Sequence, residues 1–377
     1  MPWLRPSRRF LSNMSTRTHR FFVFCIMITI VAISLFLFQN AHSFISQEQI
    51  CDSKLNEIKK LRPIHHDVSS IKPIIFIGGM PRSGTTLMRA IIDSHPQVRC
   101  GEETRVIPRI LSMRTSWEKS TIEWNRYLKL LAGGMTEQIL DSAVRSFVYE
   151  ILFYHSQSAD ILCDKDPFVL KYASYISSIF PRSKFILVVR DARAVIHSVM
   201  TRKVTITGFS LTDYRQNLKL WDKGFAVMYD QCKEVGKDRC LMVYYEQLVL
   251  QPKQTIENII QFLNITWVDD VLHHEEFIGK KISLSKTEHS SDQVVKPINL
   301  EALTKWVGHI PVDIIREIDK LAPMLRTLGY DTKSKVPSYG IPDELVLKNM
   351  NRLKNNAKFW NAKAKLYARK LPNTTDF

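Results

Sequence analysis

The hydrophobic residues of this chain form short continuous runs that alternate with stretches of helical spacing from residue 72 onward. Three runs are typical of buried strands, over residues 73–79, 184–190 and 241–245. Each is followed by a helical pattern, which extends through Ile92, through Met200 and over residues 256–263. Continuous β-branched runs separated by helices are typical of parallel strands that are buried on both faces. We therefore predict one α/β domain over residues 71–340, with a parallel sheet flanked by helices.

A longer apolar segment, residues 21–38, carries no charge. As a helix it would span about 27 Å, close to the thickness of the hydrocarbon core. A cleaved signal peptide is the alternative, but its apolar region is usually only about 7–15 residues long. Five arginines precede the segment, whereas Glu48 and Asp52 follow it. The positive-inside rule then predicts a cytoplasmic tail over residues 1–20, a transmembrane signal-anchor over 21–38 and a lumenal stem over 39–70.

The chain is basic, with 53 Lys and Arg against 37 Asp and Glu, and hence a formal net charge of +16. Such an excess favours anionic partners. No nucleic-acid-binding module and no basic run interleaved with aromatic residues is recognisable, so we expect no nucleic-acid partner. Eight Lys or Arg lie among scattered apolar residues between Pro342 and Lys370. We predict a basic, amphipathic helical tail over residues 341–377, which either lies solvated on the domain surface or binds an acidic partner.

Six cysteines fit a lumenal domain, because the secretory lumen is oxidising. Cys25 lies in the apolar segment and Cys51 in the stem, and the four others allow three pairings. We expect Cys100–Cys163 and Cys232–Cys240, since each cysteine lies near a strand end and the other pairings would cross between unrelated regions. Each disulfide would contribute about 2–4 kcal/mol. No CxxC and no matching histidine spacing supports a zinc site instead.

Two Asn-x-Ser/Thr sequons fall on the lumenal side, at Asn264 and Asn373. Asparagine in this pattern accepts N-linked glycans in secretory proteins. Both residues are therefore candidate glycosylation sites.

The sequence Gly79-Met-Pro-Arg-Ser-Gly84-Thr85-Thr86 follows the first predicted strand and opens the first predicted helix. Two glycines separated by four residues, between a strand and a helix, are typical of a loop that binds phosphate through backbone N–H groups. Thr85 stands where a nucleotide triphosphatase has lysine, and Arg82 lies inside the loop. With no evident acidic metal ligand downstream, we expect no metal-assisted phosphoryl transfer and no metal site. A donor with a less charged transferring group fits better.

Several segments together resemble tyrosylprotein sulfotransferases, over about residues 73–339. They are Pro81-Arg-Ser-Gly-Thr-Thr86, Val98-Arg-Cys-Gly-Glu-Glu-Thr-Arg105, Cys163-Asp-Lys-Asp-Pro167, Val189-Arg-Asp191, Lys296-Pro-Ile-Asn299 and Trp306-Val-Gly-His-Ile-Pro311. The resemblance implies a P-loop-like sulfotransferase fold and 3′-phosphoadenosine 5′-phosphosulfate as the donor. It also implies a type II Golgi membrane topology, a homodimer, and tyrosines near acidic residues of secretory and membrane proteins as acceptors. A carbohydrate sulfotransferase, a P-loop kinase or NTPase, and an inactive Golgi binding protein remain as alternatives.

The resemblance also implies the catalytic residues. A tyrosine hydroxyl has a pKa near 10, so its attack on sulfur requires a general base. Glu103 matches the base of the family, and its neighbour Glu102 is the competitor. Arg82, Lys165 and Ser290 match the positions that stabilise the transferring group. For Lys165 the residues alone would suggest a surface lysine.

The donor site follows from the same resemblance. Arg190, Ser198 and Arg202 can converge on the 3′-phosphate, although Arg190 could instead pair with Asp191 or Asp166. Arg105 and Arg109 would bind acidic residues of the acceptor. The other expected donor-binding residues are Arg82, Ser83, Gly84, Thr85, Thr86, Tyr245 at the end of the third strand, Ser290, Ser291, Asp292, Gln293, Val294, Val295, Lys296, Pro297, Ile298, Asn299 and Lys305.

Overall fold

The computed structural model describes residues 33–36, 71–117, 121–155, 159–285 and 287–368. The predicted cytoplasmic tail, the predicted stem, Asn373 and all but residues 33–36 of the predicted signal-anchor lie outside the described residues. Residues 33–36 are helical. Among the helices described, none is both long and apolar enough to cross a membrane. The chain divides into two units, and residues 128–136 belong with the N-terminal one, whereas the five strands of the sheet all belong to the larger unit.

Five parallel strands form one sheet, as the apolar pattern predicts. Their order is β2-β3-β1-β4-β5. The strands are β1 (Ile74–Gly79), β2 (Val98–Cys100), β3 (Ile161–Lys165), β4 (Lys184–Val189) and β5 (Cys240–Tyr244). The three predicted strands are confirmed as β1, β4 and β5, and the sequence analysis missed β2 and β3. Since all strands are parallel, the segments that follow their carboxyl ends meet at one edge of the sheet.

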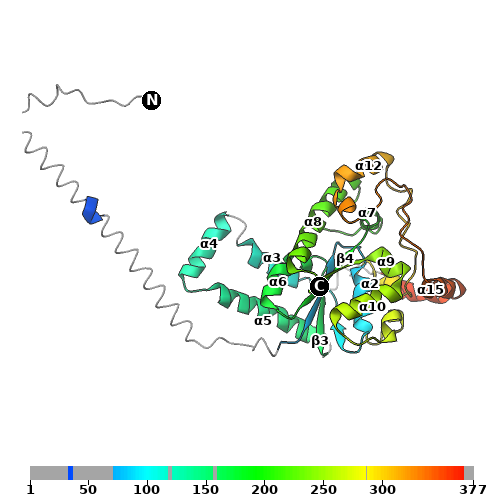
Figure 1. The fold of residues 1–377 in the computed structure, drawn as a ribbon, viewed down its shortest axis with the longest axis horizontal. Coiled ribbons are helices and arrows are strands. Elements are labelled where there is room, and N and C mark those ends of the chain that lie inside the picture. The colour runs from blue at the N-terminus through cyan, green and yellow to red at the C-terminus, as the bar shows by residue number, and fades with distance from the viewer. Residues whose placement is uncertain (1–32, 37–70, 118–120, 156–158, 286, 369–377) are drawn as a thin grey trace, which may run out of the picture. The chain divides into compact units, whose positions relative to one another are not determined.

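Helices cover both faces of the sheet (Figure 1). Alternate β1 residues point to opposite sides: Phe76 packs with one core cluster and Ile77 with the other. The first cluster includes residues of α6, α7 and α8, and the second includes residues of α2, α9 and α10. The helices are α2 (Thr85–Ser94), α3 (Ile107–Ser116), α4 (Thr121–Ala132), α5 (Glu137–His155), α6 (Ala173–Ile179), α7 (Ala192–Thr201), α8 (Tyr214–Val235), α9 (Tyr245–Leu250), α10 (Pro252–Leu263), α11 (Ser291–Val294), α12 (Val312–Arg316), α13 (Ile318–Leu321), α14 (Met324–Thr327), α15 (Glu344–Asn355) and α16 (Ala357–Leu366).

The expected disulfides, Cys100–Cys163 and Cys232–Cys240, are both present. Cys100 and Cys163 are direct cross-strand partners of β2 and β3, with Cα atoms 4.4 Å apart. The cysteines are separated by 63 residues in this pair and by 8 in the other. Because the entropy lost by the unfolded chain grows with loop length, the first bond should stabilise by about 4 kcal/mol and the second by about 2.5 kcal/mol.

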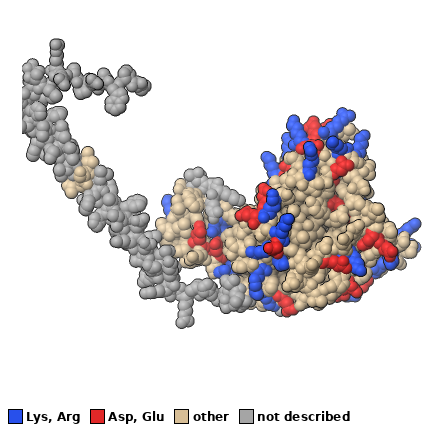
Figure 2. All heavy atoms as spheres, viewed as in Figure 1, with Lys and Arg blue, Asp and Glu red and all other residues tan. Residues whose placement is uncertain are grey.

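The basic C-terminal segment forms α15 and α16, which pack on the rest of the unit. Arg352 lies 2.9 Å from a Glu275 oxygen, and Lys363 donates to the Glu275 carbonyl at 2.7 Å. Asn349 donates to the carbonyl of Ile298 at 3.1 Å. On the face shown in Figure 2, Lys and Arg lie among Asp and Glu rather than in one continuous basic patch. The C-terminal helices therefore contact the segment that contains the predicted donor-binding residues.

Candidate active site

The loop between β1 and α2 has the geometry of an anion-binding turn. Gly79 and Gly84 have φ of 152° and 107°. A Cβ on Gly79 would lie 2.5 Å from the Val188 carbonyl oxygen, and one on Gly84 would lie 2.4 Å from the Tyr245 ring. Only glycine fits either position without displacing a neighbour. Gly84 immediately precedes Thr85, the first residue of α2. The loop therefore leads into a helix N-terminus, whose backbone N–H groups favour a bound anion.

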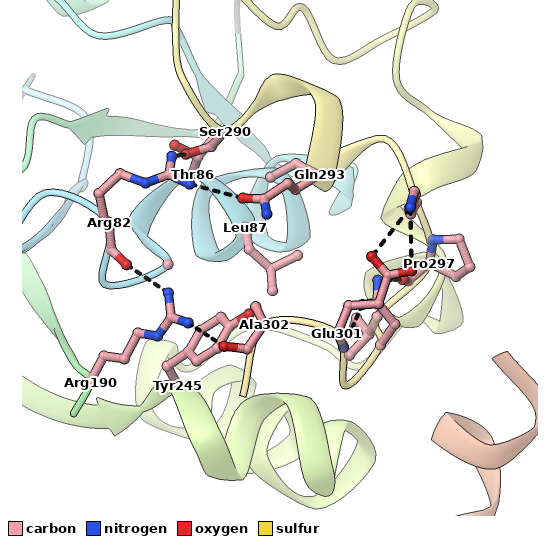
Figure 3. A pocket seen from close by; sticks show the side chains of 15 residues that line it. Arg82, Thr86, Leu87, Arg190, Tyr245, Ser290, Gln293, Pro297, Glu301 and Ala302 are labelled. Atoms are coloured by element: carbon pink, nitrogen blue, oxygen red, sulfur yellow. Dashed lines mark hydrogen bonds and ion pairs between the residues drawn. The ribbon is translucent and has the colours of Figure 1, made fainter. Parts of the chain in front are cut away.

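Arg82 joins three segments that are far apart in the sequence, and Figure 3 shows its contacts with Ser290 and Gln293. It has a left-handed φ of 75° inside the loop. Its guanidinium donates to Ser198 Oγ at 3.0 Å, to Ser290 Oγ at 2.5 Å and to Gln293 Oε1 at 2.9 Å. Burial, with the nearby Arg202 and Arg190, lowers the pKa of Arg82 to about 10, so the side chain stays positively charged at neutral pH. All four of these residues are predicted donor-site residues.

Lys165 is the centre of a second, buried cluster. Only 1% of Lys165 is exposed, which shows that the surface reading of this residue is wrong. Its ammonium lies 2.5 Å from Glu103 Oε1, 3.2 Å from Glu288 Oε1 and 3.5 Å from Thr86 Oγ1. The Thr86 hydroxyl donates to the other Glu288 oxygen at 3.1 Å. The cluster therefore connects the phosphate loop, the predicted base and residues 287–305, which we call the late segment. Sequence reasoning missed Glu288.

The two carboxylates around Lys165 have opposite pKa shifts. Burial raises the pKa of Glu103 against the effect of Lys165, and Glu288 raises it further. Burial also acts to raise the pKa of Glu288, but Lys165 and Arg89 outweigh it and hold that pKa below its usual value. Glu288 is therefore the more easily deprotonated of the two, and Glu103 is a stronger base than an exposed glutamate. Glu102 has no hydrogen bond or ion pair with Lys165 among the described residues.

Asp166 fixes the loop that contains Glu103. Its carboxylate accepts hydrogen bonds from Thr104 Oγ1 at 2.5 Å and from the Arg105 backbone N–H at 3.1 Å. Arg105 has a left-handed φ of 58°. Its side chain is 58% exposed and lies 3.7 Å from Glu103. Arg109 is likewise exposed, on α3. Both predicted acceptor-binding arginines are thus at the surface, and Arg105 lies next to the predicted base.

A cavity of about 120 Å³ contains the residues expected for the 3′-phosphate. Arg190, Ser198, Arg202 and Lys305 line it, together with His197 and Trp306, which the sequence analysis did not single out. Arg190 donates to the carbonyl oxygens of Arg82 at 2.8 Å and of Ala302 at 2.7 Å, and these main-chain contacts replace the ion pair with Asp191 or Asp166.

Tyr245 and Arg202 complete the walls around Arg190. The Arg190 guanidinium lies over the ring of Tyr245, 4.3 Å from its centroid. Tyr245 does not end the third strand as expected: β5 ends at Tyr244, and Tyr245 begins α9. Arg202 lies just after α7 and pairs with Asp292 at 2.8 Å. Asp292 therefore holds a cationic donor-site residue in place, and its carboxylate is not itself suited to bind an anion.

An adjoining cavity of about 70 Å³ contains most of the remaining expected donor-binding residues. Some predicted residues do not line it: the Ser291 hydroxyl donates to the Ser285 carbonyl at 2.6 Å, and Val295 packs in a core cluster with Ile278. Ser83 and Thr85 contribute backbone to the loop, and their side chains do not line either cavity. The lining residues are Arg82, Gly84, Thr86, Leu87, Arg190, Tyr245, Ser290, Gln293, Val294, Lys296, Pro297, Ile298, Asn299, Glu301 and Ala302.

One group of possible metal ligands lies elsewhere. Ligand atoms of His273, Glu275 and Glu276 lie within 4.8 Å of one another. Arg352 pairs with both glutamates, at 2.9 and 3.4 Å. The positive charge that these carboxylates attract is thus already supplied by an arginine.

An anion-binding loop without a Walker lysine, next to a glutamate paired with a buried lysine, defines a group-transfer enzyme of the α/β class. The model of the sulfotransferase family matches residues 73–269. Protein-tyrosine sulfotransferase A of Caenorhabditis elegans is 55% identical over 292 residues, which are 78% of this chain and 76% of that protein. Protein-tyrosine sulfotransferase 2 of Gallus gallus is 55% identical over 77% of this chain and 78% of its own. Protein-tyrosine sulfotransferase 1 of Homo sapiens is 52% identical over 74% of this chain and 76% of its own.

The chain belongs to the sulfotransferase family, and within it to the protein-tyrosine sulfotransferases. The resemblance expected from the sequence motifs is thereby confirmed, and so is the parallel sheet flanked by helices.

Proposed function

We propose that this enzyme transfers a sulfuryl group from 3′-phosphoadenosine 5′-phosphosulfate to the hydroxyl of protein tyrosines. The observation that carries the proposal is the partly buried contact of Glu103 with Lys165, next to the phosphate loop. A raised carboxylate pKa suits a base that must accept a proton from a phenol. The family membership supports the same reaction.

In the proposed reaction Glu103 accepts the tyrosine proton while the phenolic oxygen attacks sulfur. The new bond is oxygen to sulfur, and the bond that breaks joins sulfur to the phosphate oxygen of the donor. Arg82, Lys165 and Ser290 donate hydrogen bonds to the sulfuryl oxygens and to the leaving phosphate, where negative charge increases. The hydrogen bond of Arg82 to Ser290 holds these two residues side by side.

The leaving group is adenosine 3′,5′-bisphosphate, and the two cavities suit its two ends. Backbone N–H groups of residues 84–86, at the start of α2, would surround the 5′-phosphate. Arg190, Ser198, Arg202 and Lys305 would bind the 3′-phosphate. Tyr245 and the segment 293–299 would enclose the nucleoside.

Acceptor choice and location extend the proposal. Exposed Arg105 and Arg109 favour acceptors with acidic residues near the target tyrosine. The apolar segment 21–38 and the arginines before it support a single-pass type II protein with a lumenal catalytic unit in the Golgi. We infer a homodimer from the family resemblance. Asn264, which is exposed at the end of α10, is accessible for glycosylation.

The test is transfer of labelled sulfate from the donor to three acceptors. They are an acidic peptide with one tyrosine, the same peptide with phenylalanine, and a glycan. We expect label on the tyrosine peptide alone. Label on the glycan but not on the tyrosine peptide would replace this proposal with a carbohydrate sulfotransferase.

A further inference from the structure

A third cavity lies beside β2, the outer strand of the sheet. Its volume is about 280 Å³, larger than either donor-side cavity. It shares no lining residue with them among the described residues. We call it the basic pocket, and it is lined by Asp93, Arg99, Cys100, Gly101, His155, Gly279, Lys280, Lys281, Ile282 and Ser283.

Positive charge exceeds negative charge in the basic pocket. Arg99, Lys280 and Lys281 line it, with Asp93 as the one carboxylate. Asp93 is already bound: one oxygen accepts from the Cys100 backbone N–H at 2.9 Å, and the other lies 3.4 Å from Arg89. Burial and then repulsion by Arg99 lower the pKa of Lys281, which Asp270 and Asp93 only partly oppose. An anion in the pocket would relieve this repulsion.

Arg99 could donate a further hydrogen bond to an anion in the basic pocket. Its Nη1 donates to the His95 carbonyl at 3.2 Å, whereas its Nε is buried without a hydrogen-bond partner in the described part of the chain. Lys281 donates to the Ser94 carbonyl at 2.9 Å and keeps further N–H groups. Lys280 is exposed at the rim. Two hydrogen-bonded cations, Arg99 and Lys281, and the exposed Lys280 therefore line the same cavity.

The basic pocket lies next to the loop that contains the base. Gly101, in the pocket wall, precedes Glu103 by two residues, which span at most about 7 Å. A Cβ on Gly101 would lie 2.1 Å from His155 Nδ1, so the chain there passes directly against the imidazole. An extended acceptor advances about 3.3 Å per residue. A side chain two to four residues from the target tyrosine could then reach the pocket.

We propose that the basic pocket binds a carboxylate side chain of the acceptor protein, two to four residues from the tyrosine that is sulfated. The pocket thus determines specificity beside β2, at a place that shares no residue with the contact of Arg105 and Thr287 in the late segment. This inference rests on the proposed function.

The experiment measures kcat and KM of the full chain with two peptides. One has acidic residues on both sides of the tyrosine, and the other has them replaced by Asn and Gln within four residues. The variants are Lys280→Glu and Arg99→Gln, and the control is Lys358→Glu, which makes the same charge change as Lys280→Glu on exposed α16. We expect Lys280→Glu and Arg99→Gln to raise KM for the acidic peptide about five- to tenfold. Their kcat and their affinity for adenosine 3′,5′-bisphosphate should stay unchanged, and KM for the neutral peptide should hardly change.

Each other outcome overturns a distinct claim. Equal KM in Lys280→Glu, Arg99→Gln and the control would refute the pocket while leaving the proposed function intact. No turnover of either peptide by the parent enzyme would refute the proposed function itself. If inorganic sulfate binds the parent but not Arg99→Gln, and removing peptide acids changes nothing, the pocket binds a free anion and the acceptor assignment is wrong.

Discussion

The phosphate loop and the late segment, residues 287–305, meet in the active site but are built in different ways. The loop is fixed by its neighbours in the chain: β1 ends at its first glycine, and α2 begins at Thr85. The late segment contains one short helix, α11. Its position depends on distant residues, because His274 contacts the Val294 carbonyl at 2.9 Å and Asn349 holds the Ile298 carbonyl.

The difference shows that half of the site is formed locally and half is formed only by the completed fold. The halves are joined by Arg82 to Ser290 and by Thr86 to Glu288. Changes in the loop should therefore affect chemistry directly. Changes behind the late segment should affect donor affinity first.

The largest effect is expected at the base, which belongs to neither half. Glu103→Gln should lower kcat about 10²–10⁴-fold, since it removes the proton acceptor and keeps the shape. Affinity for adenosine 3′,5′-bisphosphate, measured by calorimetry, should not change. Glu102→Gln is the matched control, and loss of turnover in that variant instead would exchange the roles of the two residues.

Glu288→Gln tests whether Glu288, in the late segment, raises the pKa of the base Glu103. Glu288 raises the pKa of Glu103 and shares Lys165 with it, so its neutralisation should lower that pKa. A base acts when deprotonated, and the acid limb of kcat/KM should therefore shift to lower pH. A weaker base should also lower the plateau rate, by roughly tenfold. A limb that stays in place, or shifts to higher pH, would contradict the coupling of the two glutamates.

Arg190→Ala should weaken adenosine 3′,5′-bisphosphate binding. Loss of a hydrogen bond to a charged group costs about 1.5–3 kcal/mol, which is roughly 10- to 150-fold in Kd. Calorimetry provides the measurement. Arg109→Ala serves as the comparison, since it should raise KM for the acceptor and leave donor affinity as it is. An unchanged Kd in Arg190→Ala would reject its role at the 3′-phosphate.

The smallest effect is expected from the C-terminal helices. Asn349 is 4% exposed, and Asn349→Ala removes its hydrogen bond to the donor cavity wall. A loss of about 1 kcal/mol predicts a roughly fivefold weaker donor Kd with kcat retained at saturating donor. Asn351→Ala, on the exposed side of α15, is the control. Equal donor affinity in the two variants would show that α15 does not support the late segment.

The sequence predicts the locally formed half well. Residues 74–79 and 184–189 are continuous apolar strands, and the glycine turn follows the first of them directly. β2 and β3 were missed because Val98–Cys100 is three residues long and β3 ends in Asp164 and Lys165, which have no apolar pattern. Tertiary contacts bury these two charged residues, and the spacing of apolar residues in the sequence does not reveal such contacts.

The late half shows the opposite. Glu288 lies in a segment without regular spacing, just before the residues that carry the resemblance. Only the fold brings it within 3.2 Å of Lys165. Ser291 and Val295 were assigned to the donor with the whole segment, but α11 turns their side chains inward. A contiguous sequence motif identifies the segment that forms the site. Which of its side chains face the cavity depends on how the segment folds.

The most direct test of Glu103 as the base uses acceptors that differ only in phenol acidity. The measurement is the rate of the parent and of Glu103→Gln with a tyrosine peptide and its ring-fluorinated tyrosine counterpart, at one pH. Fluorination lowers the pKa of the phenol, so the acceptor ionises without help. The account predicts that the fluorinated peptide restores much of the rate lost in Glu103→Gln and changes the parent far less. An identical ratio of parent to variant rates with both peptides would contradict it.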